Sequence, residues 1–169
     1  MLENDDLAPL VDQEALKEFR SRALSPEHPV ARGMAENPDT FFTHRESCNN
    51  YYDAVPAIVE DYMNKVSEIT GRKYGLFSYY GAADAERVII AMGSVTEAIR
   101  ETIDHLTAQG EKVGLVAVHL YRPFSAKHFL AAVPATAKTI AVLDRTKEPG
   151  ANGCLLYTSP SPRDRSVSR

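Results

Sequence analysis

From residue 87 onward, apolar positions form short unbroken runs separated by longer amphipathic stretches. The runs at 87–93, 112–120 and 138–144 have the continuity of strands that are buried on both faces of a sheet. The stretches at 94–110 and 125–134 carry apolar residues at helical spacing. This βαβαβ order predicts a partial parallel sheet with right-handed crossovers, and therefore an α/β fold class.

The first of these predicted helices has a recognisable beginning and an apolar face. Ser94 and Glu97 have the spacing of a capping box, in which each side chain bonds to the backbone of the other. We expect Val95, Ile99 and Leu106 to face the core, because they recur at helical spacing.

Before residue 87 the pattern is helical and irregular, with almost no strand signal. One helix is predicted after Asp12, which can cap it, and the stretch 25–50 follows without a sustained period. So long an irregular stretch is typical of a segment that wraps another surface. A second helix is predicted to begin at Asp53, with Pro56 in its first turn, and to end at Gly71. Its apolar face comprises Val55, Ile58, Val59, Tyr62, Met63, Val66 and Ile69.

The last 16 residues, Cys154 to Arg169, break from everything before them. Back-translation of their first residues gives a DNA sequence that resembles a transposase adapter end used in sequencing libraries. We interpret 154–169 as adapter-derived and not native, and exclude it from fold reasoning as one would a tag. We expect the native sequence to continue past Gly153 differently.

Composition limits which kinds of partner and which cellular compartment we expect for the protein. The 169-residue chain has a net charge of −4, and removing the tail's three Arg and one Asp leaves −6. A mildly acidic chain argues against nucleic acid or an anionic membrane as the main partner. No apolar run approaches a membrane span, and the acidic start lacks the features of a signal peptide. We expect a soluble, cytoplasmic protein.

No set of side chains has the spacing of a reactive centre. The five histidines are scattered, and Cys48, the one cysteine before the tail, has no CxxC partner. The turn at Gly93 and Ser94 could present backbone N–H groups to a phosphate, but neither GxGxxG nor GxxxxGK[ST] is present. We therefore assign no catalytic, cofactor-binding or metal-binding residue.

The sequence YRPF, which begins at Tyr121, lies where the second predicted strand ends. Ligands of open parallel sheets collect at the carboxyl ends of strands, so Arg122 and Lys147 could meet an anion there. The alternative, which we favour, is that this stretch only sets up the next helix, with Phe124 and Phe129 as a hydrophobic staple.

Long stretches of the chain resemble a known enzyme family. NPDTFFTHRESCNNYYDAVPAIVEDYMNKVSEITGRKYGLFSYYGAADAERVIIAMGSV, VHLYRPF and IAVLDRTKEPGANG are similar to pyruvate:ferredoxin (flavodoxin) oxidoreductase, and the resemblance runs from about Leu7 to Gly153. It implies that 1–86 is the end of a thiamine-pyrimidine-binding domain. It also implies that 87–153 begins a second domain similar to the C-terminal domain of transketolase, so that the chain is an internal fragment.

The resemblance implies a reaction for the parent protein. The family oxidatively decarboxylates pyruvate to acetyl-CoA with thiamine diphosphate and magnesium, and passes electrons through iron–sulfur clusters to ferredoxin or flavodoxin. A homodimer is implied as well. None of the family's ligand sets maps onto this chain, so we expect the fragment itself to be inactive and to hold no cofactor.

Two other classes of protein remain open on the sequence. A related thiamine enzyme, such as a transketolase or a 2-oxoacid dehydrogenase subunit, would share the architecture of the second half. A non-catalytic interaction module would also account for an acidic helical segment joined to a small sheet.

Overall fold

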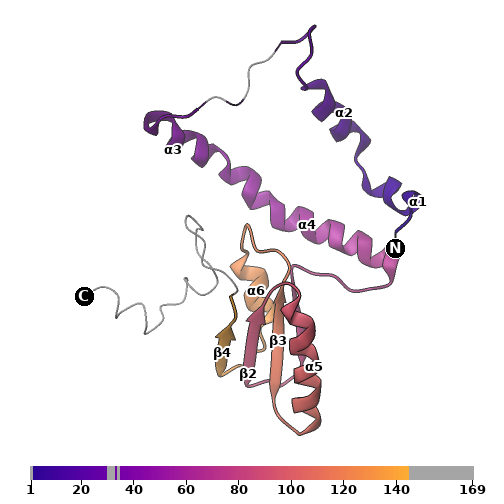
Figure 1. Ribbon diagram of the computed structural model, residues 1–169, viewed down its shortest axis with the longest axis vertical. Coiled ribbons are helices and arrows are strands. Elements are labelled where there is room, and N and C mark those ends of the chain that lie inside the picture. Colours follow the sequence, from indigo (N-terminus) through magenta and orange to yellow (C-terminus); the bar gives the residue numbers. More distant parts are fainter. Residues whose placement is uncertain (1, 30–32, 34, 145–169) are drawn as a thin grey trace. The chain divides into compact units, whose positions relative to one another are not determined.

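A computed structural model describes residues 2–29, 33 and 35–144 of the chain (Figure 1). The chain divides into two compact units, Met1–Tyr74 and Gly75–Arg169. Lys147 and the whole of the predicted adapter-derived tail lie outside the described residues.

The secondary-structure elements described in the first unit are all helices. None of its described residues is buried. Its elements are α1 (Asn4–Leu7), the 3₁₀ helix η1 (Ala8–Leu10), α2 (Gln13–Ser21), α3 (Pro38–Ser47) and α4 (Asn49–Thr70).

Two helix ends in this unit follow the sequence prediction. The Asp12 side chain accepts a hydrogen bond from the backbone N–H of Ala15 at 2.9 Å and so caps α2. Gly71 ends α4 in the left-handed conformation, with φ 69°, and its N–H donates to the Ser67 carbonyl.

Two other predictions for this unit were wrong. The stretch 25–50 is not irregular throughout, because α3 occupies Pro38–Ser47, with Pro38 in its first turn. Moreover, α4 begins at Asn49 rather than Asp53, so Pro56 lies inside the helix. An interior proline removes one helical hydrogen bond and crowds the carbonyl four residues earlier, yet α4 continues through Pro56 to Thr70.

The second unit is a four-stranded sheet with the strand order β1-β3-β2-β4. The three predicted strands are present, and β2 pairs in parallel with both β3 and β4. The α/β fold class is therefore confirmed. The elements are β1 (Phe77–Gly81), β2 (Arg87–Ala91), α5 (Val95–Ala108), β3 (Val113–Val118), α6 (Ala126–Ala132) and β4 (Thr139–Val142).

The strand β1 is a finding that the sequence pattern did not predict. It pairs antiparallel with β3, with Phe77 opposite Val118 and Tyr80 opposite Leu115, so the sheet is mixed rather than wholly parallel. A five-residue strand with aromatic residues on both faces shows little alternation, and its partner lies more than 30 residues further along the chain.

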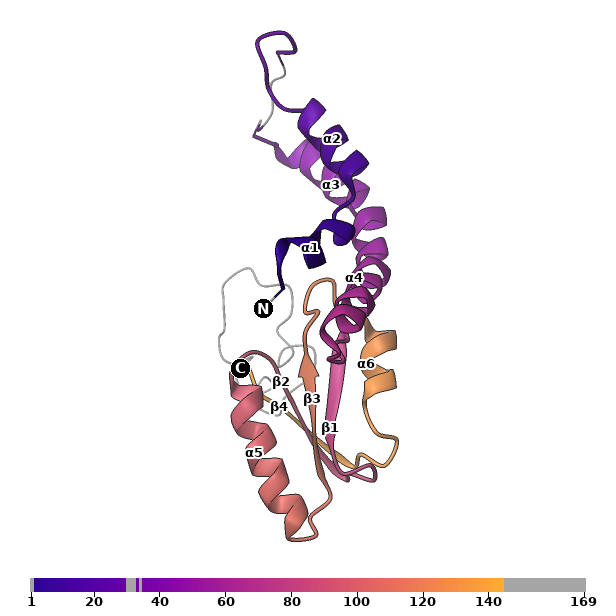
Figure 2. The same cartoon turned by 90° about the vertical axis from the view of Figure 1, so that its right-hand side faces the viewer.

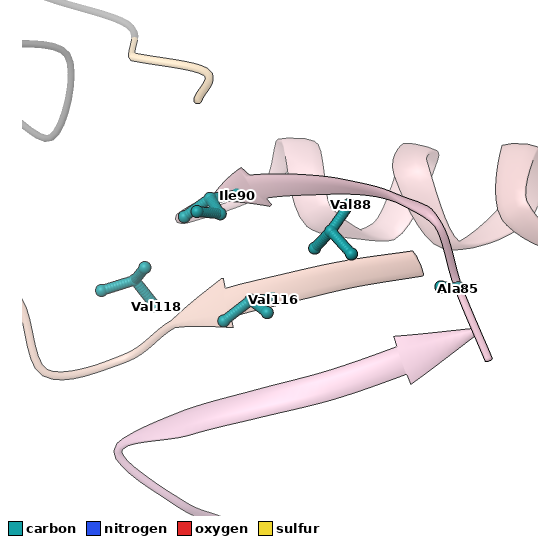
Figure 3. Close-up of a cluster of buried hydrophobic side chains, with 5 residues drawn as sticks. All are labelled: Ala85, Val88, Ile90, Val116 and Val118. Carbon is teal, nitrogen blue, oxygen red and sulfur yellow. The ribbon is translucent and has the colours of Figure 1, made fainter. Parts of the chain in front are cut away.

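Two cores lie on opposite faces of this sheet, and Figure 2 shows α5 and α6 on opposite sides of the strands. Alternation along the strands divides the apolar residues between the faces. The face toward α6 buries Ala85, Val88, Ile90, Val116 and Val118 (Figure 3). The face toward α5 buries Ala91, Ile103, Leu115 and Ala117.

The expected inward face and capping box of α5 need correction. Val95 is 43% exposed, whereas Ile103, which we had not placed in the core, is 3% exposed. Ser94 makes no side-chain cap hydrogen bond. Instead, the Thr96 hydroxyl donates to the Gly93 carbonyl at 2.7 Å. The helix begins with helical backbone at Ser94, which removes the extended geometry that a capping box requires.

Candidate site at the carboxyl edge of the sheet

The topology singles out one edge of the sheet. The parallel neighbours β2 and β3 lead into α5 and α6, which lie on opposite faces. Open α/β sheets bind their ligands at the carboxyl ends of strands where the chain diverges in this way. The loop after β2 contains Gly93 and Ser94, and the loop after β3 contains Tyr121 and Arg122.

The β2 side of this edge is open. Gly93 has φ 77°, a conformation that glycine adopts without strain, and a Cβ added there would meet nothing within 4 Å. Its carbonyl is bonded by Thr96, which is nearly buried and thereby fixes the turn. The geometry admits a ligand here, but no side chain converges on the turn to bind one.

The β3 side is organised by aromatic packing. Phe124 lies 5.4 Å from Phe129 and 5.3 Å from Phe77, between ring centroids, so the predicted staple is present and extends to β1. The Arg122 guanidinium lies 5.6 Å from the centroid of the Tyr121 ring. The other residue of the predicted anion site, Lys147, lies outside the described residues.

Sequence reasoning missed a polar seam between α5 and β1. The His119 Nε2 atom lies 3.2 Å from the Ser78 hydroxyl oxygen, and the Tyr80 hydroxyl donates to Asp104 at 2.6 Å. The Arg100 guanidinium lies 5.4 Å from the centroid of the Tyr80 ring. These side chains meet only because β1 pairs with β3, and that pairing left no signal in the sequence.

Burial and charge set the protonation of this seam. Partial burial lowers the pKa of His119, and the nearby Arg100 charge lowers it further, so the imidazole is held in its neutral form at neutral pH. The hydrogen bond to Asp104 raises the pKa of the Tyr80 phenol. Tyr80 and Asp104 also line an open depression of about 570 Å³. The seam is a hydrogen-bonded surface.

Neither a magnesium site nor an iron–sulfur cluster is assigned to the described residues. Within the described ranges, no three or more His, Cys, Asp or Glu side chains are grouped so that they could hold a metal ion. Cys48 is a free cysteine. An iron–sulfur cluster needs several thiolates, so we derive no catalytic step for this chain through either group.

Taken together, the two units define an α/β protein in which helices without a core of their own precede a sheet with helices on both faces. Two family models match the chain in consecutive order. "Pyruvate flavodoxin/ferredoxin oxidoreductase, thiamine diP-bdg" matches residues 1–64, and "Pyruvate:ferredoxin oxidoreductase core domain II" matches residues 85–161. The chain therefore belongs to the pyruvate:ferredoxin (flavodoxin) oxidoreductase family.

Curated relatives agree with this assignment. The chain is 58% identical over 157 residues to a pyruvate-flavodoxin oxidoreductase from Enterobacter agglomerans, and 57% identical over 157 residues to a pyruvate:ferredoxin oxidoreductase from Moorella thermoacetica. Each alignment covers 93% of this chain and 13% of the relative, so the chain spans about an eighth of their length.

A solved structure of 2-oxoglutarate:ferredoxin oxidoreductase from Magnetococcus marinus, with 2-oxoglutarate, coenzyme A and succinyl-CoA bound, is a weaker match. It is 23% identical with a TM-score of 0.39, and the alignment covers 69% of this chain and 20% of that one. We base no argument on this likeness.

Proposed function

We propose that this chain is part of an enzyme that oxidatively decarboxylates pyruvate to acetyl-CoA and passes the electrons to ferredoxin or flavodoxin. The observation that carries the proposal is the order of the two family matches, 1–64 followed by 85–161. Identity of 58% to a relative with that activity in its name supports it.

Within that enzyme, the residues of this chain act as scaffold. The core on each face of the sheet fixes the carboxyl edge, while the described residues of the helical unit form no core of their own. The complete protein would use thiamine diphosphate and magnesium at pyruvate and iron–sulfur clusters for electron transfer, because such cofactors carry chemistry that side chains cannot. We assign no catalytic, cofactor-binding or metal-binding residue to this chain.

The proposal includes a domain assignment. Residues 1–86 form the C-terminal part of the thiamine-pyrimidine-binding domain, although β1 within them pairs into the sheet. Residues 87–153 form the first part of a transketolase-C-like domain, and 154–169 derive from an adapter. The family match that ends at residue 161 reaches into this last segment. A second clone of the gene that still encodes CLLYTSPSPRD would overturn the adapter assignment.

We further propose a cytoplasmic homodimer with pyruvate, coenzyme A and ferredoxin or flavodoxin as partners, and with neither nucleic acid nor membrane as a partner. No helix among the described residues is long and apolar enough to cross a bilayer. A transketolase or 2-oxoacid dehydrogenase subunit, or a non-catalytic module, is not favoured because both family matches name the same oxidoreductase.

The test is an assay of the full-length protein from the same gene. We expect pyruvate- and coenzyme A-dependent reduction of ferredoxin or flavodoxin, lost when thiamine diphosphate is removed. The fragment alone serves as the matched control and should reduce neither carrier. Full-length protein that turns over a different 2-oxoacid but not pyruvate would overturn the substrate assignment while leaving the family unchanged.

A further inference from the structure

The helix α4 carries a broad apolar stripe with no core beside it. Tyr52, Val55, Val59, Tyr62, Val66 and Ile69 follow one another at alternating spacings of three and four residues along Asn49–Thr70. This is the spacing of a helix that packs along its whole length. Yet none of the helix is buried, and Ile58 on the flank of the stripe is 53% exposed.

The width of the stripe indicates what kind of surface would cover it. Tyr51, Ile58 and Met63 widen it on both flanks, so the apolar face exceeds the two positions per heptad that pair two helices. Acidic side chains lie instead on the opposite face of the helix, at Asp53, Glu60, Asp61 and Glu68.

The charge on the flank is already neutralised within the helix. Lys65 is the charged residue of the flanks, and its ammonium lies 2.7 Å from an Asp61 carboxylate oxygen and 4.8 Å from the centroid of the Tyr62 ring. The flanks therefore offer none of the interhelical ion pairs by which two copies of a helix select each other. The acidic face can remain in water, whereas the stripe can be buried against a broad apolar surface.

We propose that the α4 stripe packs against the remainder of the thiamine diphosphate-binding domain of the same polypeptide, rather than against a second copy of α4. The match to that domain covers residues 1–64 and so includes most of α4. The chain spans 13% of its relatives, whose remaining length supplies the covering surface. The proposal rests on family membership and does not require that pyruvate is the substrate.

Cross-linking in the full-length protein tests which surface lies against the stripe. A photoreactive amino acid is placed at Ile58, with a matched control at Asp61 on the acidic face. Mixing isotopically light and heavy protein before assembly separates cross-links within one polypeptide from those between two. We expect intrachain products from position 58 to the thiamine-binding domain, and at least about tenfold fewer from position 61. Interchain products at position 58, or no difference between the two positions, would overturn the proposal.

A pair of double variants provides the second readout. Val59→Gln with Val66→Gln makes the stripe polar while improving helix propensity, and Glu60→Gln with Glu68→Gln places the same residue type on the opposite face. In the full-length protein, we expect trypsin to cleave after Lys65 roughly tenfold faster in the first variant than in the unmodified protein, because local opening of the helix governs such cleavage. The second variant should be cleaved at the same rate as the unmodified protein. If the first variant does not fold, Val59→Ala with Val66→Ala replaces it. Equal cleavage in both variants would overturn the proposal, as would dissociation of the oligomer with an unchanged cleavage rate. Neither readout depends on pyruvate turnover.

Discussion

The two units differ in whether they bury apolar surface within their own fold. Among its described residues, the sheet unit buries ten hydrophobic residues, from Leu76 to Val118. The helical unit buries none of its described residues, although α4 carries an apolar stripe along its length. A sheet with helices on both faces closes upon itself, whereas separate helices close only against another surface.

This difference predicts how each unit responds to change in the isolated chain. Substitutions in the sheet unit should act through packing and backbone fit, because their surroundings are already present. The same changes in the helical unit should cost little until the rest of the protein is supplied.

The largest effect is expected from removing a buried side chain. Leu115 is 0% exposed, so Leu115→Ala should lower the free energy of unfolding of the sheet unit by about 2–5 kcal/mol. Ile58→Ala in the helical unit should change it by less than about 0.5 kcal/mol in this chain. Urea denaturation followed by circular dichroism measures both. Equal costs for the two would show that α4 has a core that we have not recognised.

A smaller effect is expected from two glycines that both have positive φ. At Gly81 an added Cβ would lie 2.5 Å from the Val113 carbonyl oxygen, so Gly81→Ala should cost about 1–3 kcal/mol from overpacking alone. At Gly71 the Cβ would meet nothing within 4 Å, so only the backbone penalty of about 1–2 kcal/mol remains. Thermal unfolding of the two variants should therefore separate them. A Gly71 variant that melts at the lower temperature would contradict the comparison.

Acid should affect the sheet unit through ion pairs at the starts of its strands. Lys112 lies 2.6 Å from Asp84, and Lys138 lies 2.8 Å from Glu86; these partners lower the pKa of both carboxyls. A lowered folded-state pKa means that the stabilisation is present above the unfolded values of about 4 and is lost as pH falls through the lower folded values. Melting temperatures between pH 6 and pH 2 should show this loss.

The matched control for these pairs comes from the helical unit. Asp84→Asn with Glu86→Gln should flatten the acid slope of the sheet unit, while Asp61→Asn, which breaks a pair within α4 of the other unit, should leave that slope unchanged. All three pairs are partly exposed, so the effect is expected to be small. An unchanged slope in the double variant would assign the acid sensitivity to other groups.

The smallest effect concerns His119. Its folded pKa lies below the ordinary 6.5, so the folded state binds fewer protons than the unfolded state, and stability falls as pH drops below about 6.5. His119→Gln should remove this part of the pH dependence, and His105→Gln on the exposed face of α5 should not. Unfolding curves at pH 5, 6 and 7 compare the two. A slope that survives the His119 change would assign this pH dependence to other groups.

Much of the sheet unit followed from the sequence. Each of the strands β2, β3 and β4 overlaps a predicted apolar run, because a strand buried on both faces requires a continuous run of such residues. The α2 cap at Asp12 and the α4 end at Gly71 were predicted for an equally local reason. The start of α4 was not predicted. Pro56 suggests that the helix begins close to it, whereas in the structure the helix begins at Asn49 and continues through Pro56.

The location of the carboxyl edge of the sheet was also predicted, since it follows from the parallel order of the strands alone. The sequence alone thus determined the α/β class, the parallel strands and the apolar stripe of α4, all of which repeat over neighbouring residues. Only the tertiary structure decided that β1 joins the sheet, that Ile103 rather than Val95 is buried, and that His119 meets Ser78. These features depend on pairing between distant segments, and such contacts leave no periodic signal along the chain.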